Sequence, residues 1–187
     1  MKPADVEPFE KMVTKHTHQT HCIVGARAYD IHAEKRLPLA LLINILGGPS
    51  ANSRLNILLR EKNGLSYNIE ANYTPYNDCG MVAMYFSTDH HNLDLCRELI
   101  DKELKELRTT RLSSRRMAMT KRQFLAQMAI SMENNEGYML GAGKSFLVHD
   151  EIDTLEEVYR KVSAVTAEQI MEVAEEIFSR TSTLIYQ

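Results

Sequence analysis

The stretch that decides the fold is Leu46–Tyr67, which reads LGGPSANSRLNILLREKNGLSY. Its two glycines end one helical pattern, and Ser50 or Asn52 can cap the start of a second helix. Asn63-Gly64 ends that second helix in the left-handed conformation that glycine favours. A strand of alternating apolar and polar residues follows. We therefore expect the chain to reverse here between a helix and a strand.

Arg60 and Tyr67 stand at the two ends of this reversal. An arginine stays cationic and a tyrosine is a neutral hydrogen-bond donor at pH 7, so together they can bind a polar substrate group. Each also has a simpler explanation. Arg60 can stabilise the dipole of its helix. Tyr67, which alternates with Leu65 and Ile69, can be a core residue whose hydroxyl lies at the edge.

The pattern on both sides of this stretch predicts an α+β fold. Alternation predicts strands at 21–29, 65–74, 81–87 and 181–186, and helical spacing predicts helices at 37–46, 93–107, 113–132, 138–148 and 166–178. Two capping boxes, at 154–157 and 166–169, begin late helices. This order favours a largely antiparallel sheet with helices packed on one face. Residues 1–19 are predicted to be a linker or tail, and residues 20–187 a single domain.

Composition excludes several classes of function. The 187 residues are 44% hydrophobic and 25% charged, with a net charge of −3, so no excess of positive charge indicates nucleic-acid binding. The three cysteines are widely spaced and are expected to be reduced. The longest apolar run, 37–46, is shorter than the ~20 residues that span a bilayer. Without a visible signal peptide, a cytoplasmic location is expected.

The chain has no complete catalytic motif of its own. It contains neither H-x-x-E-H nor its reverse, which argues against a self-sufficient zinc protease. We assign no metal ligand in this chain. His16, His18 and His21 form an H-x-H-x-x-H cluster, and an independent metal-binding protein that uses them is an alternative. Gly141-Ala-Gly-Lys-Ser145 lacks the first glycine of a phosphate loop.

The order of residues in the deciding stretch resembles the pitrilysin/insulinase family of zinc peptidases, which includes the mitochondrial processing peptidases. The similarity is to the second, non-zinc half, where Leu-Gly-Gly-Gly precedes Ser-Arg-Leu and then Leu-Arg-Glu-Lys-x-Gly-Leu-x-Tyr. Tyr76-x-Asp78-x-Gly80 before a strand also fits. The resemblance covers most of residues 20–187. One departure is Pro49, which stands in place of the third glycine and removes a backbone N–H.

This resemblance implies a LuxS/MPP-like metallohydrolase fold and a division of labour between two halves. The other half, on the same polypeptide or in a partner subunit, would carry Zn²⁺ and the general base. In this half, Tyr67 would donate to the scissile carbonyl oxygen and Arg60 would bind a nearby substrate carbonyl. The resemblance also implies that Gly47 and Gly48 contact an extended peptide substrate.

Two consequences follow from such a division. The chain alone is expected to be inactive, and it would work in a homodimer, a heterodimer or a longer polypeptide. A catalytically inactive scaffold of the same family is the alternative, because members of this family can lose activity and keep the fold.

Overall fold

A five-stranded sheet organises the chain in our computed structural model, which describes residues 6–187. Its order is β1-β5-β2-β4-β3, and its strands are β1 (Glu10–Val13), β2 (Thr20–Ala28), β3 (Ser66–Pro75), β4 (Gly80–Thr88) and β5 (Ser182–Tyr186). Strand β2 pairs antiparallel with β4 and β5, and β3 pairs antiparallel with β4. Only β1 and β5 pair in parallel among these strands of the described chain. The predicted, largely antiparallel sheet is therefore confirmed.

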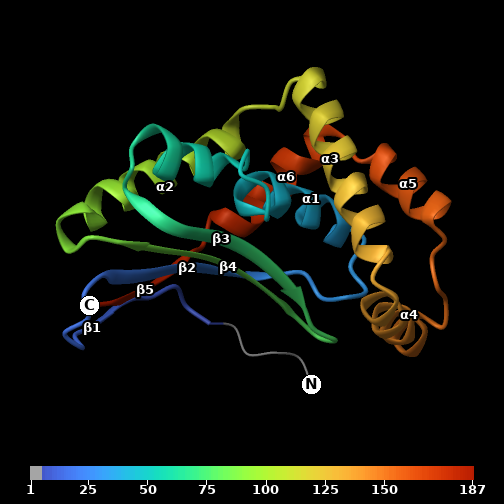
Figure 1. Ribbon diagram of the computed structural model, residues 1–187, viewed down its shortest axis with the longest axis horizontal. Coiled ribbons are helices and arrows are strands. Elements are labelled where there is room, and N and C mark those ends of the chain that lie inside the picture. The colour runs from blue at the N-terminus through green and yellow to red at the C-terminus, as the bar shows by residue number, and fades with distance from the viewer. Residues whose placement is uncertain (1–5) are drawn as a thin grey trace.

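Helices cover one face of this sheet (Figure 1). They are α1 (Arg36–Gly47), the π-helix η1 (Asn56–Lys62), the 3₁₀ turn η2 (His90–Asn92), α2 (Leu93–Thr109), α3 (Ser114–Met132), α4 (Asn135–His149), α5 (Leu155–Ala164) and α6 (Ala167–Phe178). Helices α1, α2 and α6 lie directly over the strands, whereas α3, α4 and α5 project to one side (Figure 1). The predicted α+β arrangement with helices on one face is confirmed.

The core lies between the sheet and helices α1, α2 and α6. Helix α1 is apolar nearly all round, which is typical of a helix buried on several sides. The inward residues of β2 alternate as the sequence predicts, and they are Cys22, Val24, Ala26 and Ala28. All three cysteines are free thiols, and Cys79 is only half-buried. Among the described residues, no helix is both long and apolar enough to cross a membrane.

The two predicted capping boxes are present, and α3 also has a side-chain cap. Ser113 caps α3, and the boxes at Thr154 and Thr166 each satisfy two backbone N–H groups through Glu157 and Gln169. By contrast, neither Ser50 nor Asn52 caps a regular α-helix, because residues 56–62 wind as a π-helix.

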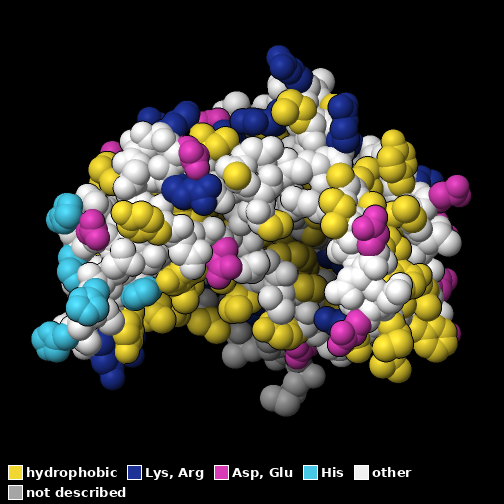
Figure 2. All heavy atoms as spheres, in the orientation of Figure 1, with side chains coloured by type: hydrophobic (Ala, Val, Ile, Leu, Met, Phe, Trp, Pro, Cys, Tyr) yellow, Lys and Arg dark blue, Asp and Glu magenta, His cyan; other side chains and the backbone are white. Residues whose placement is uncertain are grey.

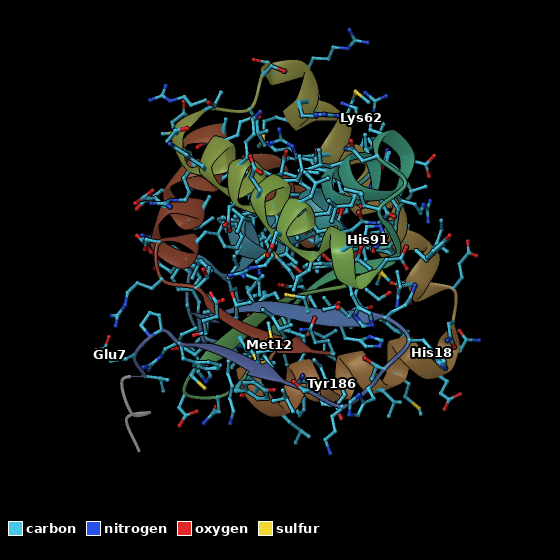
Figure 3. The ribbon with its side chains drawn as sticks, turned by 90° about the vertical axis from the view of Figure 1, so that its left-hand side faces the viewer. Glu7, Met12, His18, Lys62, His91 and Tyr186 are labelled. Atoms are coloured by element: carbon cyan, nitrogen blue, oxygen red, sulfur yellow. The ribbon has the colours of Figure 1, made fainter. Side chains whose placement is uncertain are left out.

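Strand β1 lies inside the stretch that the sequence assigns to a linker or tail. Its backbone is hydrogen-bonded to the C-terminal strand β5. The Thr183 N–H donates to the Phe9 carbonyl (2.8 Å), and the Gln187 N–H donates to the Val13 carbonyl (3.0 Å). Glu10–Val13 is an exposed edge strand, so its side chains show no buried alternation. Backbone pairing alone forms this strand, and a hydrophobic pattern could not predict it. Figure 3 labels Met12 on β1 and Tyr186 on β5, and in this pair Met12 lies opposite Ile185 and Val13 opposite Tyr186.

Candidate functional site

The Gly-Gly turn ends α1 where the helix passes closest to β3. A Cβ on Gly47 would lie 2.7 Å from Ala71 Cβ and 2.8 Å from Ala71 N, so no other residue fits without a shift. Gly48 is equally confined, because an added Cβ would lie 2.7 Å from the carbonyl oxygen of Asn44. Its own N–H already donates to that carbonyl (3.1 Å). Both glycines thus have a packing role, and their contact with a peptide stays a prediction.

The helix after this turn is held against α2 by Arg54. The Arg54 guanidinium pairs with Glu103 and, at 2.6 Å, with Glu106. Burial raises the pKa of Glu103, and the nearby Arg54 opposes that rise. The sequence shows Arg54 only as part of the motif, because its partners lie about fifty residues away. This half-buried ion pair fixes the start of the segment that leads to Arg60.

Residues 56–62 form a π-helix, a geometry that occurs often at functional sites. The reversal after it is closed by hydrogen bonds from Gly64 N–H to the Arg60 carbonyl (3.0 Å) and from Leu65 N–H to the Leu59 carbonyl (2.7 Å). Gly64 has φ of +60°, which confirms the predicted left-handed position. Figure 3 places Lys62, the last residue of this helix, on the far side of the helical layer from Tyr186.

A register shift turns Tyr67 away from the core. Ser66 pairs with Thr88, whereas Ile69 pairs with Phe86, so β3 has one extra residue between these pairs. As a result Ser66 is 2% exposed and Tyr67 is 81% exposed. The simple alternation that places Tyr67 inward with Ile69 is wrong, and so is the alternative of a core tyrosine. Within the described part of the chain, the Tyr67 hydroxyl has no hydrogen-bond partner.

Arg60 lies on the last turn of the π-helix with its side chain 41% exposed. Its guanidinium contacts the neighbouring carboxylate of Glu61, with Nη2 at 2.9 Å and Nε at 3.0 Å from Oε1. Such an exposed pair is worth about 0–1 kcal/mol. A substrate group can therefore replace Glu61 at low cost. The structure brings Arg60 and Tyr67 to the two sides of one short reversal, as the sequence predicts.

Of the three histidines in the predicted cluster, His21 forms a side-chain hydrogen bond, and His90, which lies outside the cluster, forms two. His21 Nδ1 lies 2.7 Å from the Tyr85 hydroxyl, and the two rings stack. His90 contacts Thr20 Oγ1 through Nδ1 (2.7 Å) and the Thr17 carbonyl through Nε2 (3.1 Å). Figure 2 shows histidines gathered at one end of the molecule. Nowhere in residues 6–187 do three or more His, Cys, Asp or Glu side chains group so as to hold a metal.

A hollow of about 790 Å³ lies near the other end of β3, and sequence reasoning missed it. Tyr73 and Pro75 of β3, the first turn of α1, Met128 of α3 and Val158 of α5 line it. Figure 2 shows this hollow right of centre, with hydrophobic side chains inside it. Neither Arg60 nor Tyr67 lines it.

Residues 2–124 match the sequence model of the peptidase M16 inactive domain. The chain belongs to this family. The resemblance to the non-zinc half of the zinc peptidases is thus confirmed. An uncharacterized zinc protease of Bacillus subtilis is 29% identical over 170 residues, which are 91% of this chain and 41% of that protein. An uncharacterized zinc protease of Rickettsia bellii is 26% identical over 97% of this chain and 44% of its own length.

Solved structures agree with this M16 inactive-domain fold. A protease from Helicobacter pylori superposes with a TM-score of 0.88 at 16% identity, over all of this chain and 46% of the other. A peptidase M16 inactive domain from Pseudomonas fluorescens gives 0.86 at 20% identity, over all of this chain and 45% of the other. The chain therefore spans less than half the length of these relatives.

Proposed function

We propose that this M16 inactive domain is the substrate-binding, non-zinc half of a zinc metalloendopeptidase. A second half, on the same polypeptide or in a partner subunit, would carry the zinc. The observation that carries this proposal is the register shift in β3, which leaves Tyr67 81% exposed, with no partner for its hydroxyl among the residues that the structure describes. A tyrosine that is exposed in this way gives up the stabilisation that burial of its large apolar ring would provide. A substrate contact would explain why the strand is built in this way.

Tyr67 would act as a neutral hydrogen-bond donor. When water adds to a peptide carbonyl, the oxygen gains negative charge, and an O–H already aimed at it is stabilising. The bond strengthens as charge develops, so it lowers the barrier more than it improves substrate binding. Removing one such donor costs about 10²–10³ in kcat in a well-studied hydrolase.

Arg60 would bind a substrate backbone carbonyl close to the scissile bond. Among residues 6–187, its guanidinium is held only by the exposed carboxylate of Glu61, so it is available to an incoming peptide. Strand β3, which carries Tyr67, lies at the edge of the sheet, and an extended peptide can approach such an edge. These contacts are made before and during the reaction, and they chiefly affect substrate binding.

Zinc in the other half would polarise the scissile carbonyl and lower the pKa of a bound water. The side chains of the described chain offer no group for this ion. The two matched relatives are named as uncharacterized zinc proteases, and each is more than twice as long as its aligned region. Their length supports a second half similar in size to this chain.

The test is the substitution Tyr67→Phe in the full-length protein, with a peptide whose hydrolysis is measured by mass spectrometry. We expect kcat to fall about 10²–10³-fold while KM changes little. The matched control is Tyr138→Phe, which removes the hydroxyl of a tyrosine 44% exposed on α4, and it should leave both constants unchanged.

Unchanged kcat in the Tyr67→Phe variant would refute the catalytic role. A full-length protein that binds stoichiometric zinc but cleaves no peptide in a broad library would instead favour the inactive scaffold.

A further inference from the structure

The face of the sheet opposite the helices carries an apolar surface near the start of β5. Helices α1, α2 and α6 cover one face, and Figure 1 shows no described helix over the other. On that open face Ile23 of β2 is 39% exposed and Met81 of β4 is 47% exposed. Together with Leu184 of β5 they line a hollow of about 670 Å³, which we call the open-face hollow. A contiguous apolar surface of this kind marks a contact with another segment or molecule.

Small residues form a row across this open face. Gly25 of β2 lies opposite Ser182 of β5 and Ala83 of β4 in the sheet register, and Gly25 and Ser182 line the hollow. The neighbouring row has larger side chains, because Ile23 lies opposite Leu184. A row of small side chains beside a row of large ones forms a trough, in which the side chains of a covering segment can interdigitate.

The segment before β1 runs along the rim of the open-face hollow and is fixed there. The Phe9 N–H donates to Ser182 Oγ (3.2 Å), and the Phe9 carbonyl accepts from the Thr183 N–H (2.8 Å). Val6 and Phe9 both line the hollow, and Val6 is 64% exposed. A polypeptide that continues before Val6 would therefore start at the hollow itself.

The other end of the chain lies away from the open-face hollow. Strand β5 begins at Ser182, which lines the hollow, and the Gln187 carbonyl after its last residue accepts a hydrogen bond from the Lys15 N–H, beyond the far end of β1. At about 3.3 Å per residue, Ser182 and Gln187 are roughly 16 Å apart along the strand. Residues that precede the chain, rather than residues that follow it, are therefore the ones that would begin at the hollow.

The matched relatives are long enough to provide a covering segment. The aligned region is 41% of the Bacillus subtilis protein, and this chain covers 46% of the Helicobacter pylori protease. More than half of each of these polypeptides therefore lies outside the matched region. Because that remainder belongs to the same polypeptide, it favours a segment of the longer chain over a second copy as the occupant of the open face.

We propose that the residues that precede position 1 in the full-length protein place an apolar segment over the open-face hollow, with side chains in the trough at Gly25 and against Ile23 and Met81. This inference rests on the proposed function in one respect, the existence of a second half, and it commits that half to the same polypeptide and to a docking surface on the sheet. Its test measures contact and not hydrolysis. An uncovered hollow in a protein that cleaves peptide would overturn this inference alone, and a covered hollow in a protein without activity would count only against the proposed function.

The experiment places a photo-cross-linking residue in the open-face hollow. Met81→p-benzoyl-phenylalanine is made in the full-length protein, and the peptides linked by irradiation are identified by mass spectrometry. We expect links to residues that precede position 1, in a product whose molecular mass is that of one chain. The matched control is Met119→p-benzoyl-phenylalanine, at a methionine 49% exposed on α3, which should not link to the same residues.

Each other outcome of the cross-linking overturns the proposal. Links only to residues 6–187 of the same chain, or no links, would show that the hollow is not covered by the preceding residues. Links in a product of twice the mass would assign the open face to a second copy of the chain.

Oxidation of Met81 gives an independent measurement in the unmodified full-length protein. Because exposure governs methionine oxidation, a covered Met81 should react with hydrogen peroxide about tenfold or more slowly in the native protein than in urea. Met139, which is 65% exposed on α4, is the reference and should be protected less. A native rate for Met81 within about twofold of its rate in urea would overturn the proposal.

A substitution at Gly25 tests the trough. An added Cβ there would lie 3.4 Å from the Val82 carbonyl oxygen, an ordinary contact, so the sheet can accept a side chain at this position. Gly25→Leu fills the trough, and it should lower the cross-link yield from position 81 about fivefold or more. Gly141→Leu in α4, where an added Cβ meets nothing within 4 Å, should keep the yield. Equal yields in the two variants would overturn the placement of the segment at Gly25.

Discussion

Ser66 and Tyr67 are neighbours in the chain, yet Ser66 is 2% exposed and Tyr67 is 81% exposed. The register shift that separates them also involves the Ser66 hydroxyl, which donates to the Ser87 carbonyl at 2.6 Å. A buried side chain thus holds the irregular start of β3 against β4. We therefore expect the position of Tyr67 to depend on that bond.

Ser66→Ala should destabilise the fold and loosen the placement of Tyr67. The substitution leaves the buried Ser87 carbonyl without this donor, and the expected loss is about 1–3 kcal/mol of unfolding free energy. Urea unfolding monitored by circular dichroism measures it. If the bond also positions Tyr67, kcat in the full-length protein should fall with little change in KM. A stability equal to that of the unmodified protein would show that the shift is held by other contacts.

Arg60 and Glu61 offer a pair of opposite substitutions. Arg60→Ala should raise KM because a contact to the substrate carbonyl is lost, whereas Glu61→Gln should lower KM because it removes the competing carboxylate. Because an exposed ion pair contributes about 0.2–1 kcal/mol, Glu61→Gln should lower KM by a factor of about five at most. Peptide-hydrolysis kinetics at low and high salt check both variants. Equal shifts of KM in the same direction would contradict the competition.

Gly47→Ala should destabilise the protein by about 1–3 kcal/mol, because the new methyl group would overlap Ala71. The matched control is Gly141→Ala in α4, where an added Cβ meets nothing within 4 Å. Alanine there should stabilise the helix by about 0.5–1 kcal/mol. Chemical denaturation of both variants gives the comparison, and a neutral Gly47→Ala would refute the close approach of α1 and β3.

Glu176 makes part of the stability dependent on pH. Hydrogen bonds from Lys35 and then Tyr29 lower the pKa of this carboxyl below its ordinary value. Because the folded-state pKa is the lower one, the contribution is fully present above the unfolded pKa of about 4.3 and is lost as pH falls through the folded-state pKa. Lys35→Met should therefore reduce stability at pH 7 more than at pH 3. Thermal unfolding across this pH range tests it, and an equal reduction at both pH values would argue against the linkage.

Local signals predicted much of this fold. The left-handed Gly64, the capping boxes at Thr154 and Thr166, and the alternation in β2 depend on neighbouring residues, so the sequence reveals them. The outward position of Tyr67 does not depend on neighbouring residues. The extra residue in β3 is defined by pairing with β4, about twenty residues later in the chain. Strand β1 was missed since backbone bonds to β5, not buried side chains, form it.

In the candidate site, too, the sequence predicts the local features and misses the contacts between distant segments. Arg60 and Tyr67 were predicted as the two ends of one reversal, and the structure places them there. The partners that hold the site, Glu103 for Arg54 and Ser87 for Ser66, come from distant segments. The hollow at Arg36 is assembled from β3, α1, α3 and α5, and no short sequence pattern encodes such a convergence.

The sheet order also constrains how the protein is made. Strand β5 lies between β1 and β2, although about 170 residues separate it from β1 in the chain. During synthesis, one edge of β2 must stay unpaired until residues 182–186 leave the ribosome. Long-range pairing of this kind slows folding, and an open strand edge invites association with other chains. The helices and the β2–β4–β3 portion can form early, and insertion of β5 would then be the late, chaperone-sensitive step.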